Sequence, residues 1–288
     1  MNNVYQVAGH RFAVKGERLC SVVKSIDGFA PFLVDEGDDV LFSFVEGSAV
    51  PVIKKNLYEF ECDGVTGVFG RTEKGFLLSL KILGEDALNL WHNDGERVVS
   101  VCGDGAINLY HFALWLGLGL MVAPYGTVAV HGSCIVCRGK AVLFLGESGT
   151  GKSTHTRLWR EYVDGALLLN DDSPFLRVED GKIWAYGSPW SGKTPCYKQE
   201  RYELAGCVRL SQASCNHIEK LSILQAYGAV HPSCPPAFAY DRALYAHISD
   251  FINCLLSTVP CFHMACLPDR EAALLSFKTI FGNDTGTK

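Results

Sequence analysis

The sequence predicts an α/β fold in which a β-rich N-terminal region precedes a domain built around a glycine-rich loop. Three observations predict it. Short runs rich in aromatic and β-branched residues fill the first hundred positions. A continuous apolar run, Ala141–Leu145, is typical of a strand covered on both faces. Glycine-rich residues follow this run, and a helical pattern then covers Lys152–Val163, with Leu158, Trp159 and Tyr162 on one side.

The pattern of residues changes near Ala106, which divides the chain into a β-rich region, 1–105, and a domain, 106–288, with a helical C-terminal end. The N-terminal region contains no group of residues suited to catalysis. Its expected strands include Val4–Val7, Val40–Val45, Leu57–Cys62 and Gly75–Ile82.

The second part alternates expected helices and strands. We expect a helix over 106–122, one strand over Thr127–Cys137, and a buried strand over Ala166–Leu169. A hairpin is expected around Asp180-Gly181, because these residues tolerate the positive φ of a tight turn. Two helices are expected near 240–257 and 268–281, with Pro268 in the first turn of the latter.

Composition excludes several classes of protein. The formal charge of the 288-residue chain is −5 and Lys and Arg are scattered singly, so no basic face for nucleic acid is expected. The longest apolar run, Phe112–Ala123, is shorter than the roughly 20 residues of a membrane span, so we interpret it as a buried helix. We therefore expect neither nucleic acid nor membrane as a partner.

Twelve cysteines are spread from Cys20 to Cys266 in a long, core-rich chain, which is not typical of a disulfide scaffold. The N-terminus lacks the apolar run of a signal peptide. We expect reduced, mostly buried cysteines and a cytoplasmic protein. Cys134 and Cys137 form a C-x-x-C without a second ligand pair at zinc spacing, so we favour core packing over a metal or redox site.

The glycine-rich segment Gly146–Ser153 matches the pattern G-x-x-x-x-G-K-[ST] of a P-loop. Glycines let successive backbone N–H groups converge on one anion, and the helix that follows favours negative charge at its N-terminus. Lys152, expected at the surface of the empty loop, would contact the β- and γ-phosphates, and the Ser153 hydroxyl would ligate Mg²⁺, which Mn²⁺ could replace. The expected nucleotide-binding residues are Gly146, Glu147, Ser148, Gly149, Thr150, Gly151, Lys152, Ser153 and Thr154. A chance match is the alternative, which the flanking strand and helix disfavour.

Two acids end the next apolar run, Leu167–Leu169, as Asn170-Asp171-Asp172. Such a strand end is the usual place for a metal-holding carboxylate beside a P-loop. One acid could hold the metal and the other could accept a proton from an incoming hydroxyl. A solvated turn with a capping Asp is the alternative, because Ser173-Pro174 follows.

His131-Gly132-Ser133 is the third element. A lone His is usually structural, but His131 ends Thr127–Val130, in a strand that we expect beside the strand of the P-loop. These three segments, HGS, FLGESGTGKST and LLLNDD, resemble in their order the catalytic domain of HPr kinase/phosphorylase. They are also similar to the nucleotide core of ATP-dependent phosphoenolpyruvate carboxykinase. The resemblance covers about residues 125–195 and extends weakly to the C-terminus.

The resemblance implies a P-loop domain of the phosphoenolpyruvate carboxykinase/HPr kinase type. It places His131, Asp171 and Asp172 around the γ-phosphate and metal. Catalytic roles are therefore expected for His131, Lys152, Asp171 and Asp172, with Ser153 and Asp172 as metal ligands and Asp171 nearer the acceptor.

The sequence departs from both families after the acidic strand. HPr kinases carry a Glu-Ile-Arg-Gly-like signature there, whereas Ala185–Lys193 reads AYGSPWSGK, which looks like small HPr-kinase-related proteins. Lys193, Lys198 and Arg201 could reach phosphates or an acidic acceptor, or form a solvated face. For Trp190 we favour core packing over stacking on a base.

The expected function is an ATP- and Mg²⁺-dependent kinase that transfers the γ-phosphoryl group to a hydroxyl of a peptide, a protein or a small molecule such as serine. One alternative is a small carboxykinase-like metabolic enzyme. The other is a nucleotide-binding switch without turnover, which would have no need of His131, Asp171 and Asp172. The choice between ATP and GTP, and between a monomer and a homo-oligomer, stays open.

Overall fold

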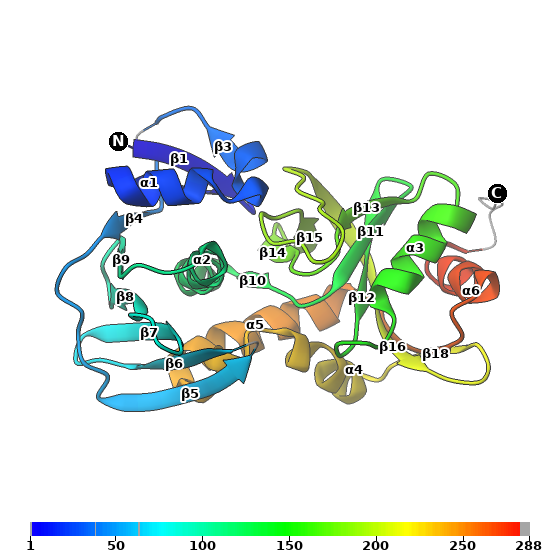
Figure 1. Ribbon diagram of the computed structural model, residues 1–288. Helices are drawn as coiled ribbons and strands as arrows, with labels where there is room; N and C mark the ends of the chain where they lie inside the picture. Colours follow the sequence, from blue (N-terminus) through cyan, green and yellow to red (C-terminus); the bar gives the residue numbers. More distant parts are fainter. Residues whose placement is uncertain (1, 38, 63, 283–288) are drawn as a thin grey trace. The chain divides into compact units, whose positions relative to one another are not determined.

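The computed structural model of the protein describes residues 2–37, 39–62 and 64–282. The chain forms two compact units. The first consists of Met1–Pro124 and Pro236–Ala246, and the second of Tyr125–Pro235 and His247–Lys288. Each unit contains one large β-sheet (Figure 1). The first unit therefore includes the helix that follows residue 105 and a short segment from late in the chain.

The sheet of the first unit has the strand order β3-β1-β2-β4-β9-β8-β7-β6-β5. β2, β4 and β9 run parallel, and the other neighbours are antiparallel. The strands are β1 (Asn2–Val7), β2 (His10–Lys15), β3 (Leu33–Val34), β4 (Phe42–Glu46), β5 (Lys55–Cys62), β6 (Val65–Arg71), β7 (Gly75–Ile82), β8 (Leu88–Asn93) and β9 (Val98–Cys102). The helices are α1 (Glu17–Lys24) and α2 (Ile107–Val122), with 3₁₀ turns at Asp27–Phe32 and Pro236–Tyr240.

Helix α2 packs against β7 and β8. It can come close to the sheet because Gly117 has no side chain: a Cβ there would lie 2.8 Å from the ring of Phe44. Among the described helices, Ile107–Tyr125 is long and apolar enough to cross a membrane by length and composition alone, yet 61% of its apolar window is buried inside the protein. This burial is consistent with the core helix of a soluble protein.

The sheet of the second unit has the order β10-β14-β15-β16-β12-β11-β13, with β18 also beside β16 and β17 beside β18. β12 and β18 run parallel to β16. The strands are β10 (Thr127–Ala129), β11 (Ser133–Cys137), β12 (Lys140–Leu145), β13 (Leu167–Asn170), β14 (Phe175–Glu179), β15 (Lys182–Tyr186), β16 (Arg201–Gln212), β17 (His217–Lys220) and β18 (Cys261–Cys266). The helices are α3 (Lys152–Tyr162), α4 (Ile223–Val230), α5 (Arg242–Thr258), which begins in the first unit, and α6 (Arg270–Phe281).

The prediction of a single strand over Thr127–Cys137 is wrong, because the strand is interrupted at residues 130–132. β10 pairs with β14, and only β11 pairs with β12. The N–H groups at the break donate to two other segments of the chain: Val130 and Gly132 to the carbonyls of Pro174 and Asp172, and His131 to that of Ser233. The strand beside β12 is therefore the one that follows His131, not the one that precedes it.

The predicted hairpin is confirmed, whereas the predicted start of the last helix is not. The hairpin around Asp180-Gly181 is confirmed: φ is 50° at Asp180 and 73° at Gly181, and β14 pairs with β15 in register around them. The placement of Pro268 in the first turn of a helix is wrong. Helix α6 begins at Arg270 and is capped by Asp269, whose carboxylate accepts from the N–H of Ala272 at 2.9 Å.

The core of the second unit is built where α3 and α6 pack together. Trp159 is fully buried, with its ring centroid 5.6 Å from that of Phe144 and 5.8 Å from that of Phe277. Ser276 accepts the indole N–H of Trp159 at 2.9 Å. This packing fixes α3, and with it the position of the loop that precedes α3.

Candidate functional site

The predicted P-loop joins the buried strand β12 to helix α3 (Figure 1). Three glycines allow its curvature, since φ is 148° at Gly146, 83° at Gly149 and 102° at Gly151, a region that other residues rarely adopt. Thr150 closes a turn by donating its N–H and hydroxyl to the carbonyl of Glu147, at 3.2 and 2.8 Å. No side chain caps α3. Its first N–H groups are thus available to an anion.

Lys152 is buried rather than exposed as expected from the sequence, with 8% of its surface accessible. Its ammonium folds back into the loop and donates to the carbonyls of Gly146 (2.7 Å) and Glu147 (3.1 Å). Burial lowers the pKa of this ammonium, and Asp172 partly offsets the effect. The curled loop supplies oxygen acceptors in place of solvent, which is why the lysine is not extended into water.

His131 lies between Lys152 and Asp172. Its Nε2 is 3.1 Å from the ammonium of Lys152, and its Nδ1 is 3.6 Å from the carboxylate of Asp172. Burial and the neighbouring ammonium lower the pKa of His131, and Asp172 opposes them. A neutral ring with its proton on Nδ1 satisfies both neighbours, because Nε2 can then accept from Lys152. The structure therefore brings His131, Lys152 and Asp172 together.

The two aspartates point to different partners. Asp171 is buried, and its carboxylate accepts three hydrogen bonds: from the hydroxyl of Ser191 and the N–H of Gly192, both at 2.7 Å, and from the N–H of Thr194 at 2.9 Å. Asp172 is half-exposed and faces His131. Because consecutive side chains diverge at a strand end, one carboxylate holds a loop while the other faces the P-loop lysine.

Asn170 and Ser188 are structural members of the site that sequence reasoning did not find. The amide of Asn170 donates to Ser188 Oγ at 3.1 Å and to the carbonyl of Trp190 at 2.9 Å, while its oxygen accepts from the N–H groups of Asp172 and Ser173. Asn170 and Ser188 are fully buried. The position of Asn170, between the apolar run and the two acids, could have marked it as a member of the site. Ser188 could not be found in this way, because it lies 18 positions later in the sequence.

Arg209 is a second cation that sequence reasoning did not find near the loop. It lies on β16 opposite Leu145, the last residue of β12. Its guanidinium donates to the carbonyl of Ala229 at 3.0 Å and pairs with Glu147 at 3.4 Å. Glu147 thus contacts both cations, through its carboxylate to Arg209 and through its carbonyl to Lys152. Only the parallel pairing of β12 and β16 brings this residue to the loop.

Arg201, Lys193 and Trp190, which the sequence also singled out, have different surroundings. Arg201 is engaged on the sheet, where it pairs with Glu179 and lies over the ring of Trp184 at 4.7 Å. Lys193 is exposed, on the loop that Asp171 holds, and makes no ion pair with any described residue. Trp190 is buried against Phe175, with ring centroids 5.7 Å apart, so it packs in the core.

A cavity of about 320 Å³ opens beside the loop within the second unit. Gly149, Gly151 and Thr154 form one side, and Gln212 and residues 266–268 form the other. Gln212 also donates to the carbonyl of Gly149 at 3.0 Å, which joins the two sides. The cavity is large enough for a planar ring and is adjacent to the uncapped helix end.

The residues present fit a magnesium ion bound together with phosphates. Mg²⁺ prefers oxygen ligands, usually one or two protein groups plus phosphates and water. Ser153, exposed at the start of α3, supplies a hydroxyl, and half-exposed Asp172 supplies a carboxylate. Among the residues that the structure describes, no three His, Cys, Asp or Glu side chains cluster as a metal cage. Cys134 and Cys137 are buried on β11 as free thiols.

Comparison with known proteins gives little beyond this geometry. No family model matches the sequence, and no curated protein matches it. Among solved structures, the chain is similar to the Hpr(Ser) kinase/phosphatase from Coxiella burnetii, with 14% sequence identity and a TM-score of 0.28. The match covers 53% of this chain and 87% of that one. This similarity is too slight to assign a fold family.

Proposed function

We propose that the second unit binds Mg·ATP at residues 146–154 and transfers its γ-phosphoryl group to a hydroxyl. The proposal is supported by one observation: buried Lys152, His131 and half-exposed Asp172 lie side by side next to the N-terminus of α3, which no side chain caps. Phosphate oxygens would replace the carbonyls as acceptors of the Lys152 ammonium. Arg209 adds a second positive charge near the same loop.

The nucleoside would occupy the cavity between the loop and residues 266–268, since this is the opening next to the helix end. Ser153 and Asp172 would hold the magnesium ion, which would neutralise charge on the transferred group. The exposed Ser153 hydroxyl stands one residue after Lys152, so both would reach the same phosphates.

His131 would accept the proton of the incoming hydroxyl. Its lowered pKa keeps the ring neutral at neutral pH, which a base requires. Asp172 faces Nδ1 and would stabilise the protonated ring. The acceptor oxygen would form a bond to the γ-phosphorus as the bond to the bridging oxygen breaks, and ADP would leave.

Asp171 would act through the loop that it holds, residues 191–194. Gly192 lies against both aspartates: a Cβ there would come within 3.3 Å of Asp171 and of Asp172. Exposed Lys193 would then stand next to the acceptor hydroxyl and favour an acceptor with a nearby negative charge. Peptides, proteins and free serine all present such hydroxyls.

Transfer from ATP labelled at the γ-phosphorus tests this function. The protein is incubated with Mg²⁺, labelled ATP, and either free serine or a pool of serine-containing peptides. We expect label on an acceptor, loss of labelling in Lys152→Ala and His131→Ala, and normal labelling in His217→Ala, a change of an exposed histidine in the same unit. Binding of ATP without hydrolysis or transfer to any acceptor would instead indicate a nucleotide-binding switch.

A further inference from the structure

Two cysteines stand opposite each other on neighbouring strands of the second unit. Cys207 on β16 and Cys261 on β18 are register partners of a parallel pair, and both are free thiols. Neighbouring strands lie about 4.8 Å apart, which falls within the Cα separation of about 4.4–6.8 Å that a disulfide spans. The backbone therefore needs no large movement to join the two sulfurs.

The two thiols are already in contact. Cys207 donates its S–H to Sγ of Cys261, and the S–H of Cys261 faces the carbonyl of Val259 at 3.8 Å. The hydrogen bond from Cys207 lowers the pKa of Cys261, although burial opposes this effect, whereas the same bond and burial raise the pKa of Cys207. Because the thiolate is the reactive form of cysteine, Cys261 is the more reactive sulfur of the pair.

A cavity reaches Cys261 on the side of the sheet that faces α4. Arg209, two positions after Cys207 on β16, donates to the carbonyl of Ala229 on α4, so the sheet face that carries both thiols faces this helix. The cavity has a volume of about 420 Å³ and is lined by Cys261, by α4 and by residues 256–260. Cys207 does not line it and is 1% exposed, against 4% for Cys261. A small solute in this cavity therefore meets Cys261 first.

The other cysteines of the described strands stand opposite residues of other types. Cys134 is as deeply buried as Cys207 and lies on the same face of the sheet, but its partner on β12 is Leu143. Cys137, three positions further along β11, points to the opposite face. Among the strands that the structure describes, the geometry for a disulfide is therefore specific to Cys207 and Cys261.

We propose that Cys207 and Cys261 form a reversible disulfide when a hydroperoxide reaches this cavity, and that the disulfide ties β16 to β18. With hydrogen peroxide, the sulfur of Cys261 attacks one oxygen, the O–O bond breaks, and one water leaves. The product is a sulfenic acid at Cys261, which the neighbouring sulfur of Cys207 attacks. The S–S bond then forms, the S–O bond breaks, and a second water leaves. In total, the two thiols lose two electrons and two protons, and one peroxide becomes two waters.

Peptide mapping of the wild-type protein, treated with increasing hydrogen peroxide, tests the proposal. Remaining thiols are blocked with iodoacetamide in denaturant, and the proteolytic fragments are weighed without reduction. We expect the fragments of Cys207 and Cys261 as one cross-linked species, lighter by two hydrogen atoms than their sum, which dithiothreitol separates again. Exposed Cys62 and Cys215 report in the same samples that enough oxidant is present. If both are oxidised while Cys207 and Cys261 stay free, the proposal is overturned.

Two serine variants test the pairing. Cys207→Ser and Cys134→Ser both remove a buried thiol from the same face of the sheet. In Cys207→Ser the first step has no second, so we expect no cross-link and a sulfenic acid at Cys261, which dimedone traps. Cys134→Ser should form the cross-link as the wild type does. A cross-link at Cys261 in folded Cys207→Ser, or its loss in folded Cys134→Ser, would contradict the direct pairing.

Cys261→Ser tests which sulfur meets the oxidant. Because Cys207 does not line the cavity, we expect its thiol to stay free in this variant at peroxide concentrations that cross-link the wild type. The iodoacetamide adduct of Cys207 measures the free fraction after unfolding. Oxidation of Cys207 in folded Cys261→Ser as fast as in the wild type would overturn the proposal that the disulfide begins with attack by Cys261.

Discussion

Asp171 and Asp172 are sequence neighbours whose carboxylates have different surroundings. Asp171 accepts hydrogen bonds from Ser191, Gly192 and Thr194, whereas Asp172 faces His131 across 3.6 Å. In Asp171→Asn, an amide would replace one carboxylate oxygen, and one donor of the loop would then lose its acceptor. We expect this variant to lose about 1–3 kcal/mol of unfolding free energy, measured by urea denaturation.

Asp172→Asn is the matched comparison. Because Asp172 is half-exposed, we expect the unfolding free energy of this variant to stay within about 0.5 kcal/mol of the wild type. We expect the variant to need a higher Mg²⁺ concentration for ATP binding, measured by titrating the metal. Identical stability and identical Mg²⁺ profiles in the two variants would contradict the division of roles.

His131→Ala tests the proposed base. We expect turnover to fall by about 10²- to 10⁴-fold, the usual contribution of a general base, while the affinity for Mg·ATP changes little. Steady-state kinetics and a binding titration separate the two effects. Normal turnover would make His131 an ordinary residue at the break between β10 and β11.

The pH dependence of kcat/KM gives a second test of His131. Burial and Lys152 lower its pKa below the usual 6.5, so the wild-type enzyme should lose activity only as the pH falls through a value below 6.5. Asp172 raises this pKa, so residual activity of Asp172→Asn should decline at a still lower pH. An acid limb above pH 6.5 in the wild type would exclude His131 as the base.

At the scale of elements, helix α3 depends on a buried histidine that must stay neutral. His155 is 2% exposed, its Nε2 lies 3.0 Å from Ser276 Oγ on α6, and burial lowers its pKa to about 4. In the unfolded chain its pKa is near 6.5, so the unfolded state binds more protons between these values. The contribution of neutral His155 to the unfolding free energy is therefore fully present above pH 6.5. It is lost as the pH falls towards 4, which lowers the unfolding free energy by about 3 kcal/mol.

Denaturation curves between pH 7 and pH 4 measure this effect. His155→Gln should show a flatter dependence of unfolding free energy on pH, although it is less stable at pH 7 because the packing with Phe144 changes. His217→Gln, at an exposed position of the same unit, should keep the wild-type slope. An unchanged slope in His155→Gln would show that His155 does not control acid stability.

The elements of the second unit could largely be predicted from local patterns. The P-loop strand and helix follow from an apolar run, glycines and an amphipathic segment, and the hairpin at Asp180-Gly181 follows from its turn residues. The break at residues 130–132 could not be predicted, because its N–H groups bond to Pro174, Asp172 and Ser233. Arg209 reaches the loop only through the pairing of β12 with β16.

The hydrogen bonds of Asp171 illustrate the same limit within the site. A pattern of two acids at a strand end indicates where carboxylates stand but not which of them a distant loop will bind. The partners of Asp171 lie 20–23 positions later, in a segment whose sequence gives no periodic pattern. Folding back of this loop decides that Asp172, rather than Asp171, faces His131.

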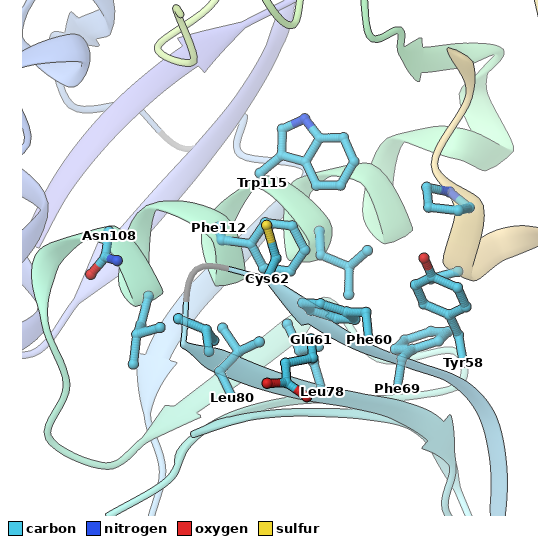
Figure 2. Close-up of a pocket in the computed structure, with 15 residues that line it drawn as sticks. Tyr58, Phe60, Glu61, Cys62, Phe69, Leu78, Leu80, Asn108, Phe112 and Trp115 are labelled. Atoms are coloured by element: carbon cyan, nitrogen blue, oxygen red, sulfur yellow. The ribbon is translucent and has the colours of Figure 1, made fainter. Parts of the chain in front are cut away.

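At the scale of the whole molecule, the candidate nucleotide site lies within the second unit, and the cavity of about 480 Å³ between α2 and the strands β5, β6 and β7 lies within the first (Figure 2). Substitutions that fill the cavity of the first unit, such as Val65→Trp, should leave the affinity for Mg·ATP within about twofold, since binding of phosphates depends on groups at the loop. Isothermal titration checks this. A folded cavity variant that has lost ATP binding would contradict this placement of the nucleotide site.

Hydrogen exchange should show the same division in the wild-type protein. Because bound phosphates occupy N–H groups of the loop and of the first turn of α3, Mg·ATP should slow exchange in peptides that cover residues 146–154. Peptides that cover β5, β6 and β7 should exchange at the rates of the free protein. Protection confined to the first unit would place the nucleotide site there.

The most direct test of the central claim is a titration of the wild type, Lys152→Ala and Lys152→Met with Mg·ATP. The Met side chain keeps an apolar stem in the place of Lys152 and removes the ammonium, and Lys220→Ala removes an exposed charge of the same unit as a control. If residues 146–154 bind the phosphates, both Lys152 variants should bind about 10- to 150-fold more weakly, the effect of losing a hydrogen bond to a charged group, while Lys220→Ala binds as the wild type does. Wild-type affinity in folded Lys152→Met would contradict the assignment of this loop as the nucleotide site.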